Sequence, residues 1–164
     1  MESPGGSNEF RFEKRRAAAV VTMVGGEVAR GSFFTAGDTT RRHGGERVAD
    51  LLNSEPGFFP FEVEGNGHPR TVLYNRAHLI SAEIFDNEPK DDPDYDVASR
   101  RPVSILLSNG RRLDAFVRVA RPAGRDRLSD WTRQPEVFRY VESGTSVLIL
   151  NAAHIVAFTE VSGP

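Results

Sequence analysis

Two stretches of this chain partly repeat each other, and this repeat constrains the fold more than any other feature of the sequence. The segment Val72–Ile80 aligns with Leu148–Val156, and its Asn, Ala and His each recur 76 positions later. At a separation of 80 positions, Arg47 and Asp50 recur as Arg127 and Asp130. Matches that keep their order at a nearly fixed separation are typical of a duplicated structural unit. We therefore predict two tandem copies of one small unit.

The order of the predicted elements repeats as well. Apolar patterning and turn signals predict five short strands and one short helix in each copy. In the first copy we expect strands at 21–24, 27–34, 58–63, 70–74 and 78–85 and a helix at 46–53. In the second copy we expect strands at 103–107, 113–119, 137–141, 146–150 and 155–161 and a helix at 128–133. This pattern indicates a mainly β (β-rich α+β) fold of two small antiparallel barrels or sheets. One intertwined unit, formed by two half-barrels that exchange strands, is the competing geometry.

Composition divides the chain into four parts. Residues 1–9 are polar and rich in Gly and Ser, and we expect them to form a disordered tail. The two β-rich repeats then cover 10–85 and 103–164. Residues 86–102 between them are predicted to be an acidic linker, because seven acidic residues fall within 83–96 and prolines occupy positions 89, 93 and 102. Such a segment buries too little apolar surface to offset its ordering entropy.

The overall composition excludes several classes of protein. The 164 residues include 21 Lys and Arg against 23 Asp and Glu, so the chain as a whole has no basic character that favours nucleic acid. The absence of Cys excludes disulfides, thiolate metal sites and cysteine nucleophiles. No apolar run approaches the roughly 18 residues that span a bilayer. Residues 1–16 also lack the apolar core of a signal peptide. We expect a cytoplasmic protein with no membrane partner.

Some segments resemble known domains. The run Leu106–Gly110 with its returning strand, together with Val147–Val156, resembles the small Sm-like barrel family. That resemblance implies a small β-barrel for each repeat. The sequence departs from the family pattern because each repeat contains a helix where Sm-like proteins continue their bent sheet, and because the usual N-terminal helix is missing. Asp50–Asn53, followed by Phe-rich extended chain, is also similar to uncharacterised bacterial domains of the same strand–helix–strand pattern.

The arginine-rich loops before the two helices are the best candidates for a binding site. Backbone amides at a helix start favour anions, and neighbouring arginines add bidentate contacts to phosphate or carboxylate. Such loops would hold a phosphate, an acidic segment of a partner or a nucleic-acid backbone. In the other interpretation, the arginines pair with nearby Asp and Glu in solvated loops. The candidate residues are Arg41, Arg42, His43 and Arg47 in the first repeat and Arg121, Arg125 and Arg127 in the second.

The apolar segment that follows the first helix is a candidate interface. Its aromatic residues Phe58, Phe59 and Phe61 would suit a partner groove or an oligomer contact. Alternation along a strand would place about half of these rings in the core.

The repeated bends carry Asn75 with His78 and Asn151 with His154. Asn bonds locally at bends, so we predict a structural turn that is built twice. A pair of metal-ligating histidines is the alternative. A duplicated turn explains the equivalence of the two histidines more simply, so we predict no metal site.

No motif of a catalytic nucleophile, such as Gly-x-Ser-x-Gly, is present. The acidic residues gather in the predicted linker, where low burial leaves carboxylates unperturbed. We therefore predict a non-catalytic protein-interaction or scaffolding module without a cofactor, which binds a protein partner or self-associates. Binding of nucleic acid or of a phosphate ligand through the arginine-rich loops is the alternative. A small-molecule hydrolase or metal-dependent enzyme is a second alternative.

Overall fold

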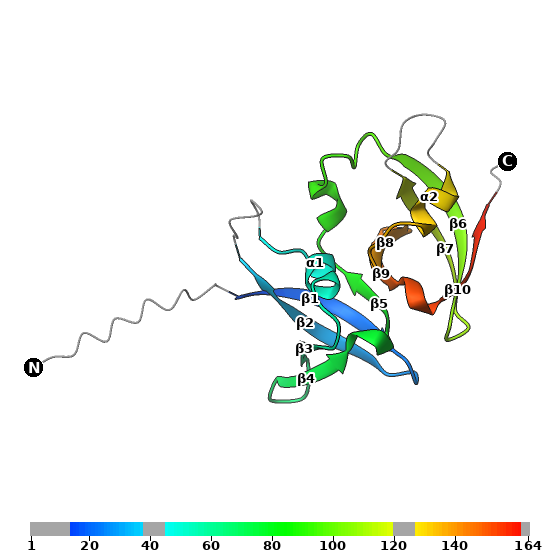
Figure 1. Ribbon diagram of the computed structural model, residues 1–164. Coiled ribbons are helices and arrows are strands. Elements are labelled where there is room, and N and C mark those ends of the chain that lie inside the picture. Colours follow the sequence, from blue (N-terminus) through cyan, green and yellow to red (C-terminus); the bar gives the residue numbers. More distant parts are fainter. Residues whose placement is uncertain (1–13, 38–44, 120–126, 162–164) are drawn as a thin grey trace, which may run out of the picture.

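A computed structural model describes residues 14–37, 45–119 and 127–161 of the chain (Figure 1). The protein is mainly β, as predicted. The strands among the described residues form one antiparallel sheet in the order β10-β6-β7-β8-β9-β5-β1-β2-β3-β4. Two short α-helices accompany this sheet in the described part of the chain.

The N-terminal half contains the first five strands. Its elements are β1 (Lys14–Met23), β2 (Val28–Ala36), α1 (Val48–Asn53), β3 (Phe58–Val63), β4 (Arg70–Asn75), the 3₁₀-helix η1 (Arg76–His78) and β5 (Leu79–Ile84).

The C-terminal half contains the other five strands. Its elements are β6 (Ser99–Leu107), β7 (Arg112–Val119), α2 (Leu128–Thr132), β8 (Phe138–Ser143), β9 (Ser146–Asn151), the 3₁₀-helix η3 (Ala152–His154) and β10 (Ile155–Glu160).

The two halves have the same strand order. The last strand of each half pairs with its first strand, which gives β5-β1-β2-β3-β4 in one half and β10-β6-β7-β8-β9 in the other. The bounds of β4, η1 and β5 recur 76 positions later as those of β9, η3 and β10. Antiparallel pairing of β9 with β5 joins the halves. β4 and β10 are left at the two ends of the sheet.

Turn chemistry explains the first hairpin of each half. Gly25 and Gly26 adopt φ of 95° and 94° between β1 and β2, and Gly110 adopts φ of 86° between β6 and β7. Side chains other than Gly rarely adopt this region, so these glycines fix the tight turns. β1 begins at Lys14, well before the expected start at residue 21. Pairing with β2 and β5 on its two sides overrides the helix propensity of the alanine run.

Gly31 marks a local difference between the halves. A Cβ atom at this position of β2 would collide with the backbone carbonyl of Glu62 on β3, so glycine permits the close approach of these strands. β2 pairs with β3 over three residue pairs. In β7 the corresponding position carries Ala115, and β7 pairs with β8 only at Phe116 and Glu142.

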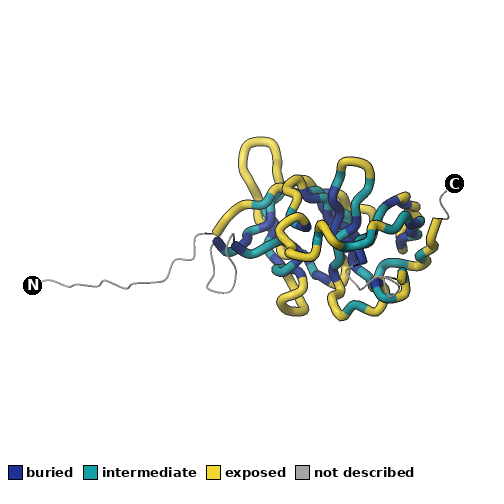
Figure 2. The backbone as a smooth tube through the Cα atoms, turned by 90° about the horizontal axis from the view of Figure 1, so that it is seen from above, coloured by how far each residue is buried: buried dark blue, intermediate teal, exposed yellow. Residues whose placement is uncertain are grey.

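Two apolar clusters form the core, one centred on each half. In the first, the Phe33 ring centroid lies 5.4 Å from that of Phe59 and 5.1 Å from that of Phe61. In the second, Trp131 of α2 stacks on Phe158 of β10 at 4.9 Å between ring centroids. Figure 2 shows that the buried stretches gather in the interior and that the turns around them are exposed. β5 and β9 contribute side chains to both clusters.

The segment predicted to be a linker, 86–102, passes from β5 to β6 and contains regular structure. Glu88–Asp91 form the 3₁₀-helix η2, in which Pro89 is buried. β6 begins at Ser99, so the last four residues of the predicted linker belong to a strand.

Candidate interaction sites

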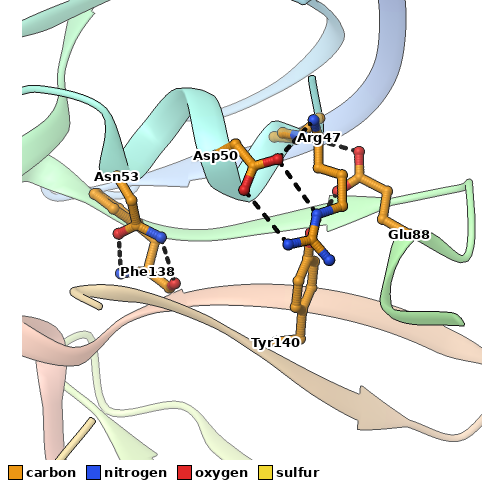
Figure 3. Close-up of polar contacts among 7 residues, drawn as sticks. Arg47, Asp50, Asn53, Glu88, Phe138 and Tyr140 are labelled. Carbon is orange, nitrogen blue, oxygen red and sulfur yellow. Dashed lines mark hydrogen bonds and ion pairs between the residues drawn. The ribbon is translucent and has the colours of Figure 1, made fainter. Parts of the chain in front are cut away.

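The Arg-x-x-Asp pattern that precedes each helix has the same local role in both halves. Arg47 is the N-cap of α1, and its backbone N–H donates to the Asp50 carboxylate at 3.1 Å. Arg127 and Asp130 make the same bond at 3.1 Å at the start of α2. The guanidinium of Arg47 also pairs with Asp50, with 3.3 Å between Nε and Oδ2 (Figure 3). The chain therefore supplies its own anion at each helix start.

The other members of the arginine-rich loops lie outside the described residues. These are Arg41, Arg42, His43, Arg121 and Arg125. Anion binding by the two loops therefore stays a prediction.

The aromatic segment of β3 is divided between the core and the surface. Phe59 and Phe61 are both 0% exposed, because they share the inward face of the strand. They are not available to a partner, and the prediction that they form an interface is wrong for these two residues. Phe58 points to the opposite face and is 61% exposed.

The Asn–His bends are built alike in both halves. Asn75 and Asn151 cap η1 and η3, and each side-chain oxygen accepts a bond from the backbone N–H two residues on, at 3.0 Å. Asn151 is 1% exposed, and its Nδ2 also donates across the halves to the Leu79 carbonyl at 2.9 Å. The bends therefore combine a local turn with a contact between the halves.

The two histidines of the bends differ in their surroundings. Nε2 of His154 lies 2.7 Å from the carbonyl oxygen of Ala77 in the other half. Because a carbonyl only accepts, Nε2 carries the proton, and Nδ1 faces the Ser108 hydroxyl at 2.8 Å. His78 is exposed, at the end of η1 beside the free strand β4.

The connecting segment ties the two halves together. Glu88 accepts a bond from the backbone N–H of Val48 in α1 at 2.9 Å. Its other carboxylate oxygen accepts from the hydroxyl of Tyr140 on β8 at 2.8 Å. Beside it, the Asn53 side chain makes a two-bond pair with the backbone of Phe138, with both bonds 2.9 Å long (Figure 3). α1 of one half is thus bonded to β8 of the other.

Burial shifts the pKa values of Glu88 and Tyr140, the two side chains that link the connecting segment to β8. It raises the pKa of Glu88 although the Val48 amide and the Tyr140 hydroxyl oppose the shift. Burial and the nearby Glu88 charge raise the pKa of Tyr140 as well. Structural networks shift pKa values just as active sites do. Both Glu88 oxygens already accept bonds that position α1 and β8, so the pair holds the halves together.

A second polar cluster lies nearby. Glu142 accepts bonds from the Arg118 guanidinium at 3.0 Å and from the Tyr95 hydroxyl at 2.8 Å. Arg118 also stacks over the Tyr95 ring, with 3.7 Å from its Cζ to the ring centroid. Burial alone would raise the pKa of Glu142, but the bonds from Arg118 and Tyr95 and the charges of Arg118 and Arg100 lower it overall.

Tyr140 of the first polar cluster and all three members of the second line an open cleft of about 550 Å³ between α1, the connecting segment and the C-terminal half. The polar side chains on its walls include Asp50, Tyr95 and Arg118, each of which is hydrogen-bonded within the chain. Among residues 14–37, 45–119 and 127–161, no group of three His, Asp or Glu side chains is arranged to hold a metal ion. No helix in these ranges is long and apolar enough to cross a membrane.

The junction of β9 with β5 is an apolar contact in which side chains of each half enter the core of the other. Ile149 (0% exposed), Val147 (8%) and Phe138 (5%) belong to the C-terminal half but pack in the first cluster. Ile80 (1% exposed) belongs to the N-terminal half but packs in the second. We call these four the crossing residues.

The free edges carry apolar counterparts of three of the four crossing residues, and the fourth, Val147, corresponds to Thr71. Leu73 occupies the place in β4 that Ile149 occupies in β9, Phe58 begins β3 as Phe138 begins β8, and Val156 follows η3 as Ile80 follows η1. These three are exposed by 65%, 61% and 64%, respectively. The sheet therefore ends on both sides in apolar side chains that nothing in the described structure covers.

Neither the crossing residues nor the free edges were predicted from the sequence. One signal was available, because Val147–Leu150 is a continuous apolar run, which is typical of a strand buried on both faces. The aligned segment 71–74 reads Thr-Val-Leu-Tyr. Its residues Thr71 and Leu73 are exposed, whereas Val72 and Tyr74 are more buried.

The chain matches no protein-family model, and no curated protein or solved structure is significantly similar to it. The resemblance to Sm-like barrels accordingly stays a prediction from the sequence.

Proposed function

We propose that this chain is a tandem duplication that acts as a non-catalytic protein-interaction module and binds partners by strand addition at its two free edges. The observation that carries this proposal is the exposure of Leu73, Phe58 and Val156, whose counterparts are buried at the junction. An edge strand presents unpaired backbone groups, and an added strand satisfies them while its side chains fill adjacent apolar positions.

The duplication is supported by the shared strand order and by the recurrence of element bounds at a separation of 76 positions. It is also supported by local chemistry, because the Asn cap of the bend and the Asp cap of the helix each occur twice. A binding role is favoured over catalysis because the perturbed carboxylates, Glu88 and Glu142, are engaged in bonds between structural elements.

Position-specific photo-crosslinking in the cells that naturally produce the protein tests this function. A photoreactive residue replaces Leu73 or Val156 at the edges, and the matched control replaces Val97, which is 79% exposed in the connecting segment. We expect protein adducts at both edge positions and few at the control. Equal labelling at all three positions, or no adduct at either edge, would contradict the proposal.

A further inference from the structure

We propose that the partner at both free edges is a second copy of this chain, with β4 of one copy paired antiparallel to β10 of the next. This inference rests on the proposed function and adds the identity of the partner and the register of the pairing. The occupant follows from the internal junction, where strands of the same two types already pair.

The junction supplies the register. Ser81, Ala82, Glu83 and Ile84 of β5 lie opposite Leu150, Ile149, Leu148 and Val147 of β9. Residues of β5 correspond to residues of β10 that lie 76 positions later, and residues of β9 correspond to residues of β4 that lie 76 positions earlier. These shifts give the corresponding pairs between copies. These are Ala157 with Tyr74, Phe158 with Leu73, Thr159 with Val72, and Glu160 with Thr71 of the next copy. The bounds of β4 and β9, and those of β5 and β10, agree residue for residue, so no insertion disturbs the transfer.

The apolar side chains fit the same scheme. Val72 and Tyr74 already pack in the core of their own half, as Leu148 and Leu150 do in theirs. The residues on the other face of β4 have no core of their own to enter, and Leu73 is the largest of them. In the paired state Leu73 and Phe58 enter the second cluster of the neighbouring copy, as Ile149 and Phe138 enter the first cluster within one chain.

The opposite edge contributes in the same way. Val156 of β10 enters the first cluster of the next copy, as Ile80 enters the second cluster within one chain. Phe158 stays on Trp131 of its own half. Each contact therefore buries exposed apolar side chains of both partners, which is the composition expected at the centre of a stable interface.

Polar groups at the bend support the pairing. Asn75 has the place of Asn151, whose Nδ2 bonds the Leu79 carbonyl across the junction. His78 has the place of His154, which bonds the Ala77 carbonyl across the junction. Between copies, Asn75 and His78 then donate to the carbonyls of Ile155 and Ala153.

Some polar pairs change between the internal junction and the proposed contact. Ser146 donates to Glu83 at 3.0 Å across the junction. Arg70 takes the place of Ser146, and Thr159 takes the place of Glu83. At the proposed contact β4 therefore carries the charge and β10 carries the hydroxyl. Asn53, which bonds the backbone of Phe138, is replaced by Arg133. The contact between copies thus differs in polarity from the internal one, because it lacks the Ser146–Glu83 bond and the Asn53–Phe138 pair.

The two edges differ from each other, so each copy offers one edge of each type. Such a head-to-tail contact forms a ring when the rotation closes and a filament when it does not.

The first test measures mass in solution by analytical ultracentrifugation from micromolar to near-millimolar protein. The unaltered chain is expected to form species larger than one chain. Leu73→Asp and Val156→Asp each place an unpaired charge in the contact, and we expect each to weaken association at least about tenfold. Val97→Asp, the matched control outside both edges, leaves association unchanged. A single-chain mass at every concentration overturns the inference.

The second test measures the register. The natural chain has no Cys, so introduced thiols react without background. Thr71→Cys combined with Glu160→Cys places thiols directly opposite each other in neighbouring copies, and we expect disulfide-linked multimers under mild oxidation. Thr71→Cys with Thr159→Cys puts the second thiol on the opposite face of β10, and we expect few links. Equal linking by both pairs, or linking by Thr71→Cys alone, overturns the proposed pairing.

The outcomes separate the two proposals. Photo-adducts with other proteins at Leu73 and Val156, together with a single-chain mass for the purified protein, leave the edge-binding function intact and overturn the self-pairing. The absence of adducts at both edges together with a single-chain mass overturns both.

Discussion

The internal junction and the free edges are built from corresponding strands, but only the junction is covered. Ile149 and Ile80 are buried at the junction, whereas Leu73 and Val156 are exposed at the edges. The strands and 3₁₀-helices of the two regions have matching bounds, 76 positions apart. The exposed apolar side chains at the edges stand at positions that are buried at the junction. Their exposure therefore reflects the lack of a neighbouring strand at each end of the described sheet.

The junction also has a tie that the edges lack. Glu88 links α1 to Tyr140 on β8 from the connecting segment (Figure 3). No segment of the described residues plays this part beside β4 or β10. A contact between copies at an edge would therefore depend on concentration, whereas the junction is intramolecular.

The largest expected difference between the two regions comes from removing one apolar side chain. Ile149→Ala leaves a cavity in a core formed mainly by the other half, and we expect it to lower the free energy of unfolding by about 2–5 kcal/mol. Leu73→Ala, its counterpart at the edge, is expected to change that free energy by less than about 0.5 kcal/mol in dilute protein. Urea unfolding at micromolar concentration measures both. Similar losses for the two variants would show that the edge is covered within one chain.

A smaller difference is expected at the Asn bends. Asn151→Ala removes the cap of η3 and also leaves the buried Leu79 carbonyl without its donor, so we expect a loss of about 1–3 kcal/mol. Asn75→Ala removes only the cap of η1, and we expect a loss of about 1 kcal/mol or less. Denaturant titration of both variants checks this order. If Asn75→Ala were the more damaging, the bond across the junction would not be the source of the difference.

The smallest expected effect is the pH dependence of stability that comes from Glu88, the residue that links α1 to β8. Burial raises the pKa of Glu88 from its usual value near 4.5, so the folded chain holds this proton more tightly than the unfolded chain. Stability of the natural chain relative to Glu88→Gln should therefore fall as pH rises through the folded pKa.

Glu142 gives the opposite sign. The Arg118 and Tyr95 bonds outweigh burial and lower its pKa, so its contribution is present above about pH 4.5 and is lost as pH falls through the folded pKa. The natural chain should lose stability relative to Glu142→Gln on acidification. Unfolding curves from about pH 3 to about pH 7 measure both slopes. Slopes of the same sign for the two variants would show that the hydrogen bonds to Glu142 do not govern its ionisation.

Much of the fold was accessible from the sequence because it depends on local chemistry. The glycine turns, the apolar patterning and the repeated bend predicted a mainly β chain with five strands and one short helix in each half. The repeated Arg-x-x-Asp pattern also marked both helix starts, although it was interpreted as a candidate anion site. In the structure, the aspartate of the same motif occupies the backbone amide of the arginine.

Other features required knowledge of which strands meet. The alanine run before Val20 has high helix propensity, and only pairing with β2 and β5 makes it a strand. The acidic composition of 86–102 indicated a linker, because composition does not show that Glu88 finds two donors from distant elements. The sequence alone makes Phe59 and Phe61 candidates for an interface, because only the fold shows that their face of β3 meets the core.

The sequence by itself determined most of the strands, the turns and the two short helices, because these depend on residues close together in the chain. Only the tertiary structure decided that β9 pairs with β5 while β4 and β10 stay at the ends of the sheet. That choice depends on side chains from the two halves sharing two cores, and burial of this kind is a property of the assembled sheet and cannot be read from any one segment.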